Sequence, residues 1–483
     1  MVLLHHSPKT KGNTNAPGNS GQAKRKRTHI WIFILATFIC VCFYNWIISG
    51  IHINWMHGNP SIEQRTRKIL TDNPLIGAAP QSLTHMMLNL QDGHNDLMML
   101  IRYLYKNHIY NNSFADLFEN GGLPGHVDLP RLRSVKVGGT FWSAYIQCPR
   151  DGFDFSDANY GPIVRATLDQ LDLYSRLHEQ YPHFFTLTGS GVEAVKAFKE
   201  DRLISPIGIE GLHQIGNSIS ILRLYHQLGV RYATLTHNCH NRYADAALVN
   251  NAEGKIVAAK PFWGGVSTHG RELIQEMNRM GMIVDLSHVS KNVMVDVLGG
   301  SPEKGWHGSL APPIFSHSSA YAICPHPRNV PDDVLQLVKD QRGLVMINFA
   351  PNFVSCGASD SPTGLPTFDP LNSTLRQVVR HIVHIGELIG YDYVGLGTDF
   401  DGIMTTPAGL EDVSKFPDLV AEMLRQNISD TDVAKVVGRN LLRVWKAVDE
   451  VAGKLQKEVH PLEDDIKPFV APSVLGQAFM HAF

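Results

Sequence analysis

The chain has 483 residues, of which 43% are hydrophobic and 18% are charged, as in an ordinary globular enzyme. Its 43 Lys and Arg residues nearly balance 45 Asp and Glu residues, so charge gives no reason to expect nucleic acid as a partner. The 24 histidines are unusually many, and they favour metal or acid–base chemistry without locating a site.

The N-terminal region predicts a membrane anchor. Residues 1–29 are polar, and their composition predicts a disordered cytoplasmic tail. The basic run Lys24–Arg27 lies near the end of this tail, and residues 30–50 hold the apolar run Ile30–Ile48. That run is about as long as a bilayer core requires. Basic residues directly before it predict a cytoplasmic N-terminus and an extracellular or lumenal body. A cleaved signal peptide and a buried helix are the alternatives.

The remainder divides into three predicted parts. Residues 51–81 form a stem, residues 82–456 form the catalytic domain, and residues 457–483 form a C-terminal tail without a clear hydrophobic anchor signal.

Eight short apolar runs alternate with amphipathic helical segments in the catalytic domain. The runs lie within SLTHMMLNLQDGHNDL, VGGTFWSAYIQC, LISPIGIEG, RYATLTHNC, GMIVDLSHVS, APPIFSHSS, GLVMINFA and YDYVGLGTDFDG. Continuous apolar strands that each precede a helix predict an α/β fold with a buried parallel sheet, and eight such units predict a (β/α)8 TIM barrel. Residues 184–190 are a weaker ninth strand candidate. A doubly wound open sheet is the alternative, but no Gly-rich phosphate loop follows the first run.

Polar residues gather at the C-terminal ends of these runs, where a barrel places its active site. The candidates are His94, Asp96, Glu210, His237, His288, His317, Asp399 and Asp401. Residues two apart on a strand share a face, so His94 and Asp96 can bind one cation together. The N and O donors suit zinc or a similar divalent ion. Five donors exceed the needs of one catalytic zinc ion and suit two ions that share Glu210.

Each candidate also has a plainer interpretation. Glu210 could cap the following helix, and a lone histidine beside a serine could cap a helix or lie hydrogen-bonded in the core. The cysteines of the body, Cys148, Cys239, Cys324 and Cys356, could form two disulfides in an oxidising compartment or remain free thiols. Three sequons at Asn111, Asn372 and Asn427 predict N-glycosylation, although such sequons also occur by chance.

Nine motifs in chain order resemble those of the membrane dipeptidase (renal dipeptidase) family, over about Leu88 to Lys446. They are DGHNDL, HVDLPRL, VGGTFWS, GIEG, TLTHNC, DLSHVS, FSHSSAY, RNVPDDVL and GTDFDG. The resemblance implies a zinc-dependent (β/α)8 barrel hydrolase related to the amidohydrolases. It also implies that Cys148 pairs with Cys239 and Cys324 with Cys356.

The resemblance further implies a role for each site residue. His94 and Asp96 would hold one zinc ion, His288 and His317 a second, and Glu210 would bridge the two around an activated hydroxide. His237 would polarise the scissile carbonyl, Arg328 would hold the substrate carboxylate, and Asp399 would transfer protons. The alternatives are a structural His237, a surface ion pair of Arg328 with Asp332 or Asp333, and Asp399 as another metal ligand.

The implied substrates are dipeptides, with cysteinylglycine-type dipeptides as specific candidates. Another barrel hydrolase acting on an amide or lactone, or a surface receptor that has lost catalysis, is the rival. The family's Gly-Gly-His reads Gly211-Leu212-His213 here, and residues 250–265 are compositionally distinct, which predicts a different pocket wall. A homodimer would be non-covalent unless Cys40 or Cys42 joined its subunits.

Overall fold

A computed structural model describes residues 35, 37, 39–41, 43–44, 60–71, 90–135, 137–200 and 202–463. The chain divides into two compact units, Met1–Ser61 and Ile62–Phe483. Among the described residues, no helix is both long and apolar enough to cross a bilayer. The anchor expected at residues 30–50 falls mostly outside the described residues and stays a prediction, as does the tail beyond residue 463.

The second unit is built on a closed barrel of eight strands, in the order β1-β12-β9-β8-β7-β4-β3-β2, and every adjacent pair is parallel. The strands are β1 (Gln91–Asn95), β2 (Gly139–Ser143), β3 (Ile207–Glu210), β4 (Val230–Thr234), β7 (Ile283–Asp285), β8 (Ile314–Phe315), β9 (Leu344–Ile347) and β12 (Val394–Leu396). Seven fall within a predicted run and β4 begins one residue before its run, so the barrel is confirmed. The ninth candidate is not a barrel strand, because Thr186 forms only an isolated bridge with Ile204.

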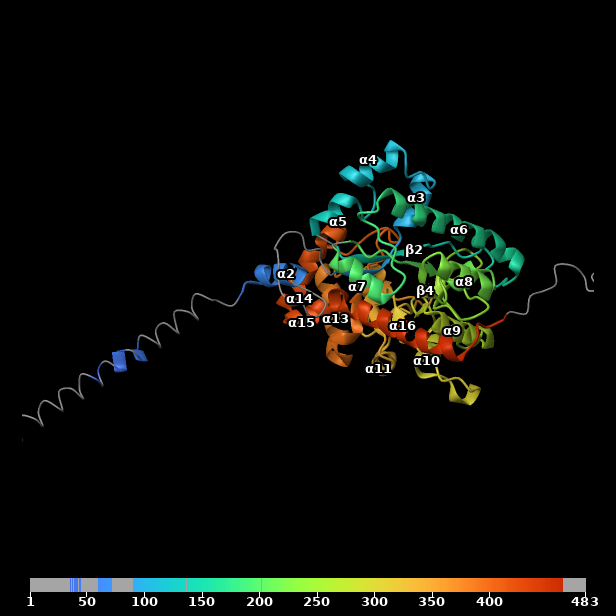
Figure 1. Cartoon of the computed structure of the whole chain (residues 1–483). Helices are drawn as coiled ribbons and strands as arrows, with labels where there is room; N and C mark the ends of the chain where they lie inside the picture. The colour runs from blue at the N-terminus through green and yellow to red at the C-terminus, as the bar shows by residue number, and fades with distance from the viewer. Residues whose placement is uncertain are drawn as a thin grey trace, which may run out of the picture. The chain divides into compact units, whose positions relative to one another are not determined.

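Helices surround the strands (Figure 1). They are α2 (Ile62–Thr71), α3 (Leu97–Tyr105), α4 (Asn112–Asn120), α5 (Leu129–Val135), α6 (Asp157–Gln180), α7 (Gly191–Lys199), α8 (Ile219–Gln227), α9 (Thr268–Met280), α10 (Lys291–Gly299), α11 (Asp332–Asp340), α12 (Pro351–Val354), α13 (Leu375–Ile389), α14 (Phe416–Arg425), α15 (Asp430–Ala434) and α16 (Asn440–Glu458). Two hairpins, β5 (Leu248–Asn250) with β6 (Ile256–Ala258) and β10 (Cys356–Gly357) with β11 (Thr367–Phe368), extend the loops after β4 and β9.

Local sequence explains where the helices start and end. Serine side chains at Ser156, Ser218, Ser267 and Ser290 accept a backbone hydrogen bond at the N-termini of α6, α8, α9 and α10. Gly281 ends α9 in the left-handed conformation that glycine favours. These helices are the next α-helices after β2, β3, β4 and β7, so their caps fix the far ends of the loops that carry the polar residues.

The barrel and α16 share an apolar core. Phe141 of β2 packs against Tyr232 of β4 and against Trp445 of α16, with ring centroids 5.2 Å apart in both pairs. Space inside the barrel is tight at Gly93, where a Cβ atom would lie 2.4 Å from the sulfur of Met346. This explains the glycine that precedes His94.

Part of the predicted stem packs against the catalytic domain. In α2, Ile69 and Leu70 are buried, and Arg65 Nε donates to Asp430 Oδ1 at 2.8 Å. Both expected disulfides are present, between Cys148 and Cys239 and between Cys324 and Cys356.

Candidate active site

The predicted site residues lie at one end of the barrel. His94 is the second-last residue of β1, Asp96 directly follows that strand, and Glu210 is the last residue of β3. His237, His288, His317 and Asp399 follow β4, β7, β8 and β12 by two or three residues. His94, Asp96, Glu210, His288 and His317 are buried, with exposures of 6% or less, and His237 and Asp399 are half-buried. His288 and Asp399 have φ values of +67° and +63°. Non-glycine residues adopt this region rarely, and such strain concentrates at functional sites.

Glu210 lies between two sets of donors. Its Oε2 atom faces His94 Nε2 at 3.8 Å, and its Oε1 atom lies 2.8 Å from His288 Nε2 and 3.4 Å from His317 Nε2. Asp96 completes the first set, with Oδ2 3.2 Å from His94 Nε2. Ligand atoms within each set lie within 4.8 Å of one another. Glu210 therefore offers one carboxylate oxygen to each of two sets of residues that could hold a metal ion.

Hydrogen bonds at the far nitrogens orient the imidazoles. His288 Nδ1 donates to Asn238 Oδ1 at 3.1 Å, and His317 Nδ1 donates to Ser316 Oγ at 2.8 Å. Ser316 in turn donates to Asp285 Oδ2 at 2.6 Å, which fixes the direction of the bond from His317. Both Nε2 atoms therefore carry lone pairs, as metal ligation requires.

The same two Nε2 atoms provide a test of whether a cation fits. They lie 2.9 Å apart, and both also face Glu210 Oε1. Three acceptors this close repel one another unless a positive charge lies among them. The pKa of His288 is held well below its usual value by burial and by Arg328, and that of His317 by burial and by His94. Neutral imidazoles are the form that binds metal.

The carboxylates show the complementary behaviour. Burial, followed by the charge of Asp96, raises the pKa of Asp399 to about 6. Burial also raises the pKa of Glu210 well above its usual value. For His94 burial opposes protonation, but the charges of Asp96 and Glu210 outweigh it and raise the pKa to about 10. Burial disfavours the ionised form of these carboxyl groups. Divalent cations bound beside them would stabilise that ionised form.

Residues behind the ligands brace them, and sequence reasoning did not identify these. Asp92 accepts hydrogen bonds from the backbone and hydroxyl of Thr398 at 2.8 and 2.7 Å, which ties β1 to the loop that carries Asp399. Asp285 ties β7 to β4 and β8 through Thr234 Oγ1 at 2.6 Å and Ser316. A buried acid two or three residues before His94 and His288 was the available signal, but the partners of these acids lie far away in the sequence.

The altered loop after Glu210 keeps a defined shape. Gly211 has a φ of +112°, and a Cβ atom there would lie 2.5 Å from His213 Nδ1. Leu212 is fully buried. Gln214 Oε1 accepts from Glu210 N at 2.9 Å, and its amide donates to Ala144 O at 2.6 Å. Leucine in place of the family's second glycine thus joins the core.

Asp399 has one oxygen held and lies beside the ligands. Asn348 Nδ2 donates to Asp399 Oδ2 at 3.0 Å. Asp399 also groups with His94 and His317 as a possible metal set. The geometry accommodates both interpretations, proton transfer and ligation.

His237 lies beside the second ligand set. Its ring centroid is 4.4 Å from that of His288 and 4.9 Å from that of Tyr145, which meets it edge to face. Its pKa is lowered well below the usual value by burial, followed by the nearby His213. Tyr145, which follows β2 and was not singled out from the sequence, feels the charges of Glu210 and Asp96 and so borders the same space.

Arg328 is a buried cation without a hydrogen-bond partner among the described residues. Its side chain is 1% exposed, and none of its three guanidinium nitrogens is bonded. The surface ion pair considered from the sequence is absent, because Asp332 pairs with His384 and Asp333 with Lys291. Burial lowers the pKa of Arg328 to about 10, although Asp399 and Glu210 attract it. A carboxylate ligand is the partner that its fork-shaped guanidinium suits.

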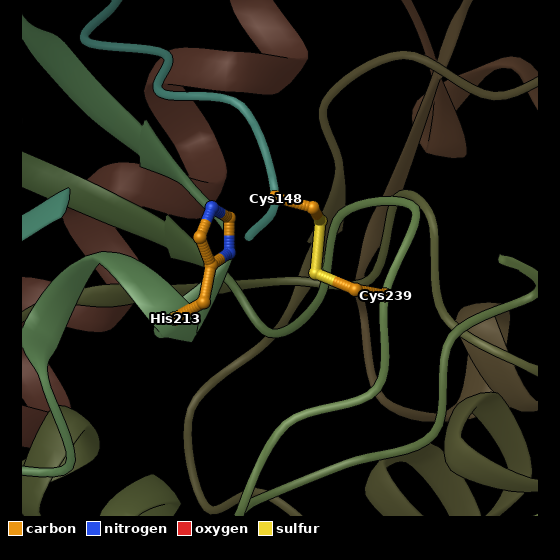
Figure 2. A group of neighbouring side chains, drawn as sticks. All are labelled: Cys148, His213 and Cys239. Atoms are coloured by element: carbon orange, nitrogen blue, oxygen red, sulfur yellow. A yellow bond between two sulfur atoms is a disulfide. The ribbon is translucent and has the colours of Figure 1, made fainter. Parts of the chain in front are cut away.

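A third cluster of donors is not a metal site. Cys148, Cys239 and His213 lie together (Figure 2), but the sulfur atoms form a disulfide and cannot act as thiolates. His213 Nε2 donates to Ile146 O at 2.8 Å. Because Cys148 Sγ lies 3.7 Å from His237 Nδ1, the bridge braces the loop that carries His237.

The exposed asparagines Asn111, Asn372 and Asn427 are accessible for glycosylation, which stays a prediction.

Comparison with known proteins identifies the family. Residues 81–459 match the model of the membrane dipeptidase family, peptidase family M19. The chain is 45% identical over 405 residues to dipeptidase aclJ of Aspergillus oryzae, covering 83% of this chain and 86% of that protein. It is 42% identical over 417 residues to dipeptidase tcpJ of Claviceps purpurea, covering 85% of this chain and 89% of that protein.

Solved structures share the fold. A metallopeptidase from Rhodobacter sphaeroides liganded with a phosphinate mimic of the dipeptide L-Ala-D-Ala gives a TM-score of 0.62 at 23% identity, covering 75% of this chain and all of that one. The probable dipeptidase PvdM from Pseudomonas aeruginosa gives a TM-score of 0.65 at 18% identity, covering 82% of this chain and all of that one. The extent of the family match and the identity to these relatives show that the chain belongs to the membrane dipeptidase family, peptidase family M19, and is a dipeptidase of the metallopeptidase class.

Proposed function

We propose that the protein hydrolyses dipeptides with a free carboxylate, using two divalent ions, zinc in the first instance, held by His94, Asp96, Glu210, His288 and His317. The observation that carries the proposal is the position of Glu210, with one oxygen toward each donor set. When bound, the two ions supply a water molecule that is deprotonated near neutral pH and positive charge beside the scissile carbonyl.

Side chains of the chain orient the substrate and move its protons. Arg328 donates two parallel hydrogen bonds to the carboxylate of the C-terminal residue and thereby gains its missing partner. His237, as a neutral imidazole, donates an N–H to the carbonyl oxygen, whose negative charge grows as the bond is attacked. Asp399, with a pKa raised by burial to about 6, accepts the proton of the attacking water and delivers it to the leaving amine.

We further propose that residues 30–50 anchor the protein in a membrane, with the catalytic domain on the extracellular or lumenal side. Two disulfides support an oxidising compartment, and the basic run Lys24–Arg27 supports a cytoplasmic N-terminus. Protease protection of sealed membranes tests the orientation, since the catalytic domain should be digested only after the membranes are opened if it is lumenal.

Purified protein with its metal content determined, assayed on a dipeptide panel that includes Cys-Gly before and after chelation, tests the catalytic proposal. Two equivalents of metal for each chain and turnover that chelation abolishes and zinc restores are expected. Full turnover after complete metal removal would refute the metal assignment. Hydrolysis of N-acylated amides or lactones in preference to every dipeptide would refute the substrate class.

A further inference from the structure

An exposed group of aromatic side chains lies next to the proposed active site, on the loops that follow β2 and β4. We call Phe153, Phe155, Phe262 and Trp263 the aromatic rim. Phe153, Phe262 and Trp263 are 55%, 49% and 41% exposed. Their rings contact one another, with centroids 5.2 Å apart for Phe155 and Phe262 and 4.8 Å apart for Phe262 and Trp263. Clustered exposed aromatics on one surface commonly mark a binding site.

The disulfide between Cys148 and Cys239 connects the aromatic rim to the proposed active site. The ring of Phe153 lies 5.6 Å from that of His240, the residue directly after Cys239. A Cβ atom on Gly152 would lie 3.4 Å from Cys239 Cβ. Since the partner of Cys239, Cys148, contacts His237, only one disulfide separates the rim from the carbonyl-binding histidine.

Phe262 and Trp263, two of the four rings, lie on a loop that is firmly held. The carboxylate of Asp245 accepts hydrogen bonds from four successive backbone amides, those of residues 262–265, at 2.8 to 3.2 Å. Trp263 Nε1 donates to Asn241 O at 2.8 Å. Asp245 also pairs with His240 at 3.1 Å. A loop fixed in this way presents its aromatic side chains to solvent in one orientation, which lowers the entropic cost of binding a ligand.

The barrel order indicates which part of a substrate meets the rim. β2, β3 and β4 are consecutive in the barrel, and β8, β9 and β12 lie on the opposite side. Arg328 follows β8 and lies over the ring of Phe353, which follows β9, at 5.3 Å. A dipeptide with its carboxylate at Arg328 and its scissile bond beside Glu210 therefore extends its N-terminal residue toward β2, β3 and β4.

We propose that the aromatic rim receives the side chain of the substrate's N-terminal residue and selects dipeptides in which that side chain is large and apolar, aromatic above all. The inference rests on the proposed function and names the substrate class of that site. The distinct segment at residues 250–265 supplies two of the four rings, so the pocket wall predicted from its composition gains a specific role. Edge-to-face and stacked ring pairs provide the selectivity.

The test compares kcat/KM for Phe-Gly, Ala-Gly and Gly-Phe in the metal-loaded full chain and in Phe153→Ala, Phe262→Ala and the double variant. The expected result is that each single variant lowers the Phe-Gly to Ala-Gly ratio about 3- to 10-fold, as loss of an aromatic pair predicts. The Gly-Phe to Ala-Gly ratio should stay constant. Leu388→Ala is a matched control, because Leu388 is 37% exposed near the end of α13, which leads into the opposite end of the barrel.

Leucine variants at positions 153 and 262 guard against misfolding, since they keep apolar volume without a ring, and they should fall between wild type and alanine. An unchanged Phe-Gly to Ala-Gly ratio in a double variant that still cleaves Ala-Gly overturns the inference alone. An unchanged ratio together with an altered oligomeric state overturns it too, and identifies the rim as a contact between copies. A wild-type protein that cleaves no dipeptide refutes the proposed function as well.

Discussion

Arg328→Met is expected to make the protein more stable and a poorer dipeptidase. The guanidinium is buried without a hydrogen-bond partner among the described residues, and burial lowers the pKa of Arg328 to about 10. At about 1.4 kcal/mol for each pH unit, this implies a cost of about 3 kcal/mol for carrying the charge in the folded chain. Methionine fills a similar volume and retains contact with the ring of Phe353.

We therefore expect the free energy of unfolding of Arg328→Met to rise by about 1 to 3 kcal/mol, in line with other replacements of buried charges by apolar residues. Removing one partner of a buried charge pair costs about 2 to 5 kcal/mol of binding. The value of kcat/KM for Ala-Gly should accordingly fall by about 30-fold to several thousand-fold. Ala-glycinamide, which lacks the carboxylate, should lose far less.

Denaturant unfolding at equal metal content and steady-state kinetics on the acid and the amide measure these effects. Arg443→Met is a matched control, because Arg443 donates to the carbonyls of Arg342, Gly343 and Asp392. That variant should lose stability and keep the preference for the acid. If Arg328→Met loses stability and treats acid and amide substrates alike, Arg328 is a structural residue and the carboxylate assignment is wrong.

Further predictions concern the ligands and a buried histidine. Glu210→Gln should lose metal and activity together, because the neutral amide cannot bridge two cations; metal analysis with full occupancy would contradict this. Asp399→Asn should keep its metal and lose turnover by about 10²- to 10⁴-fold, the usual share of a general acid–base; loss of metal would identify Asp399 as a ligand. His381 accepts from Ala320 N at 3.0 Å and donates to Val354 O at 2.8 Å, so it is neutral, and burial lowers its pKa to about 4. The unfolded chain binds this proton below about pH 6.5 and the folded chain does not, so stability should fall on acidification from pH 6.5 to 4 by about 1.4 kcal/mol for each pH unit. His381→Gln should lessen that slope in urea unfolding at several pH values, and an unchanged slope would contradict the assignment.

The barrel was predictable because its strands are buried on both faces. Runs such as LVMI in β9 are continuous and apolar and so could be recognised without a partner strand. The ninth strand candidate, residues 184–190, was inferred from the same signal, an apolar run. That segment is also apolar, and only its position beside Ile204, before β3 begins, makes it an isolated bridge.

The meeting of the candidate donors at one end of the barrel was predictable, and their surroundings were not. A histidine or carboxylate at the end of an apolar run is conspicuous, and eight such runs converge in a barrel. Ser316 and Asp285 are inconspicuous, because a serine or aspartate in a strand has many possible partners. Their bond spans 31 residues, and that of Asp92 to Thr398 spans 306. The sequence also left open whether Arg328 forms a surface ion pair, a question settled by its burial.

The bracing residues also determine the charge of the site. The far nitrogens of His94, His288 and His317 are bonded to a phenol, an amide and a hydroxyl group, each of them neutral. Acidic partners in these places would add negative charge to the ligand set. The anions of the ligand groups are Asp96, Glu210 and Asp399, and Asp285 behind His317 also attracts Arg328, so four negative charges would balance the four positive charges of the two proposed divalent ions. With Arg328 added, the loaded site would be electropositive, and a substrate would enter it carboxylate first because its own charge balances that excess.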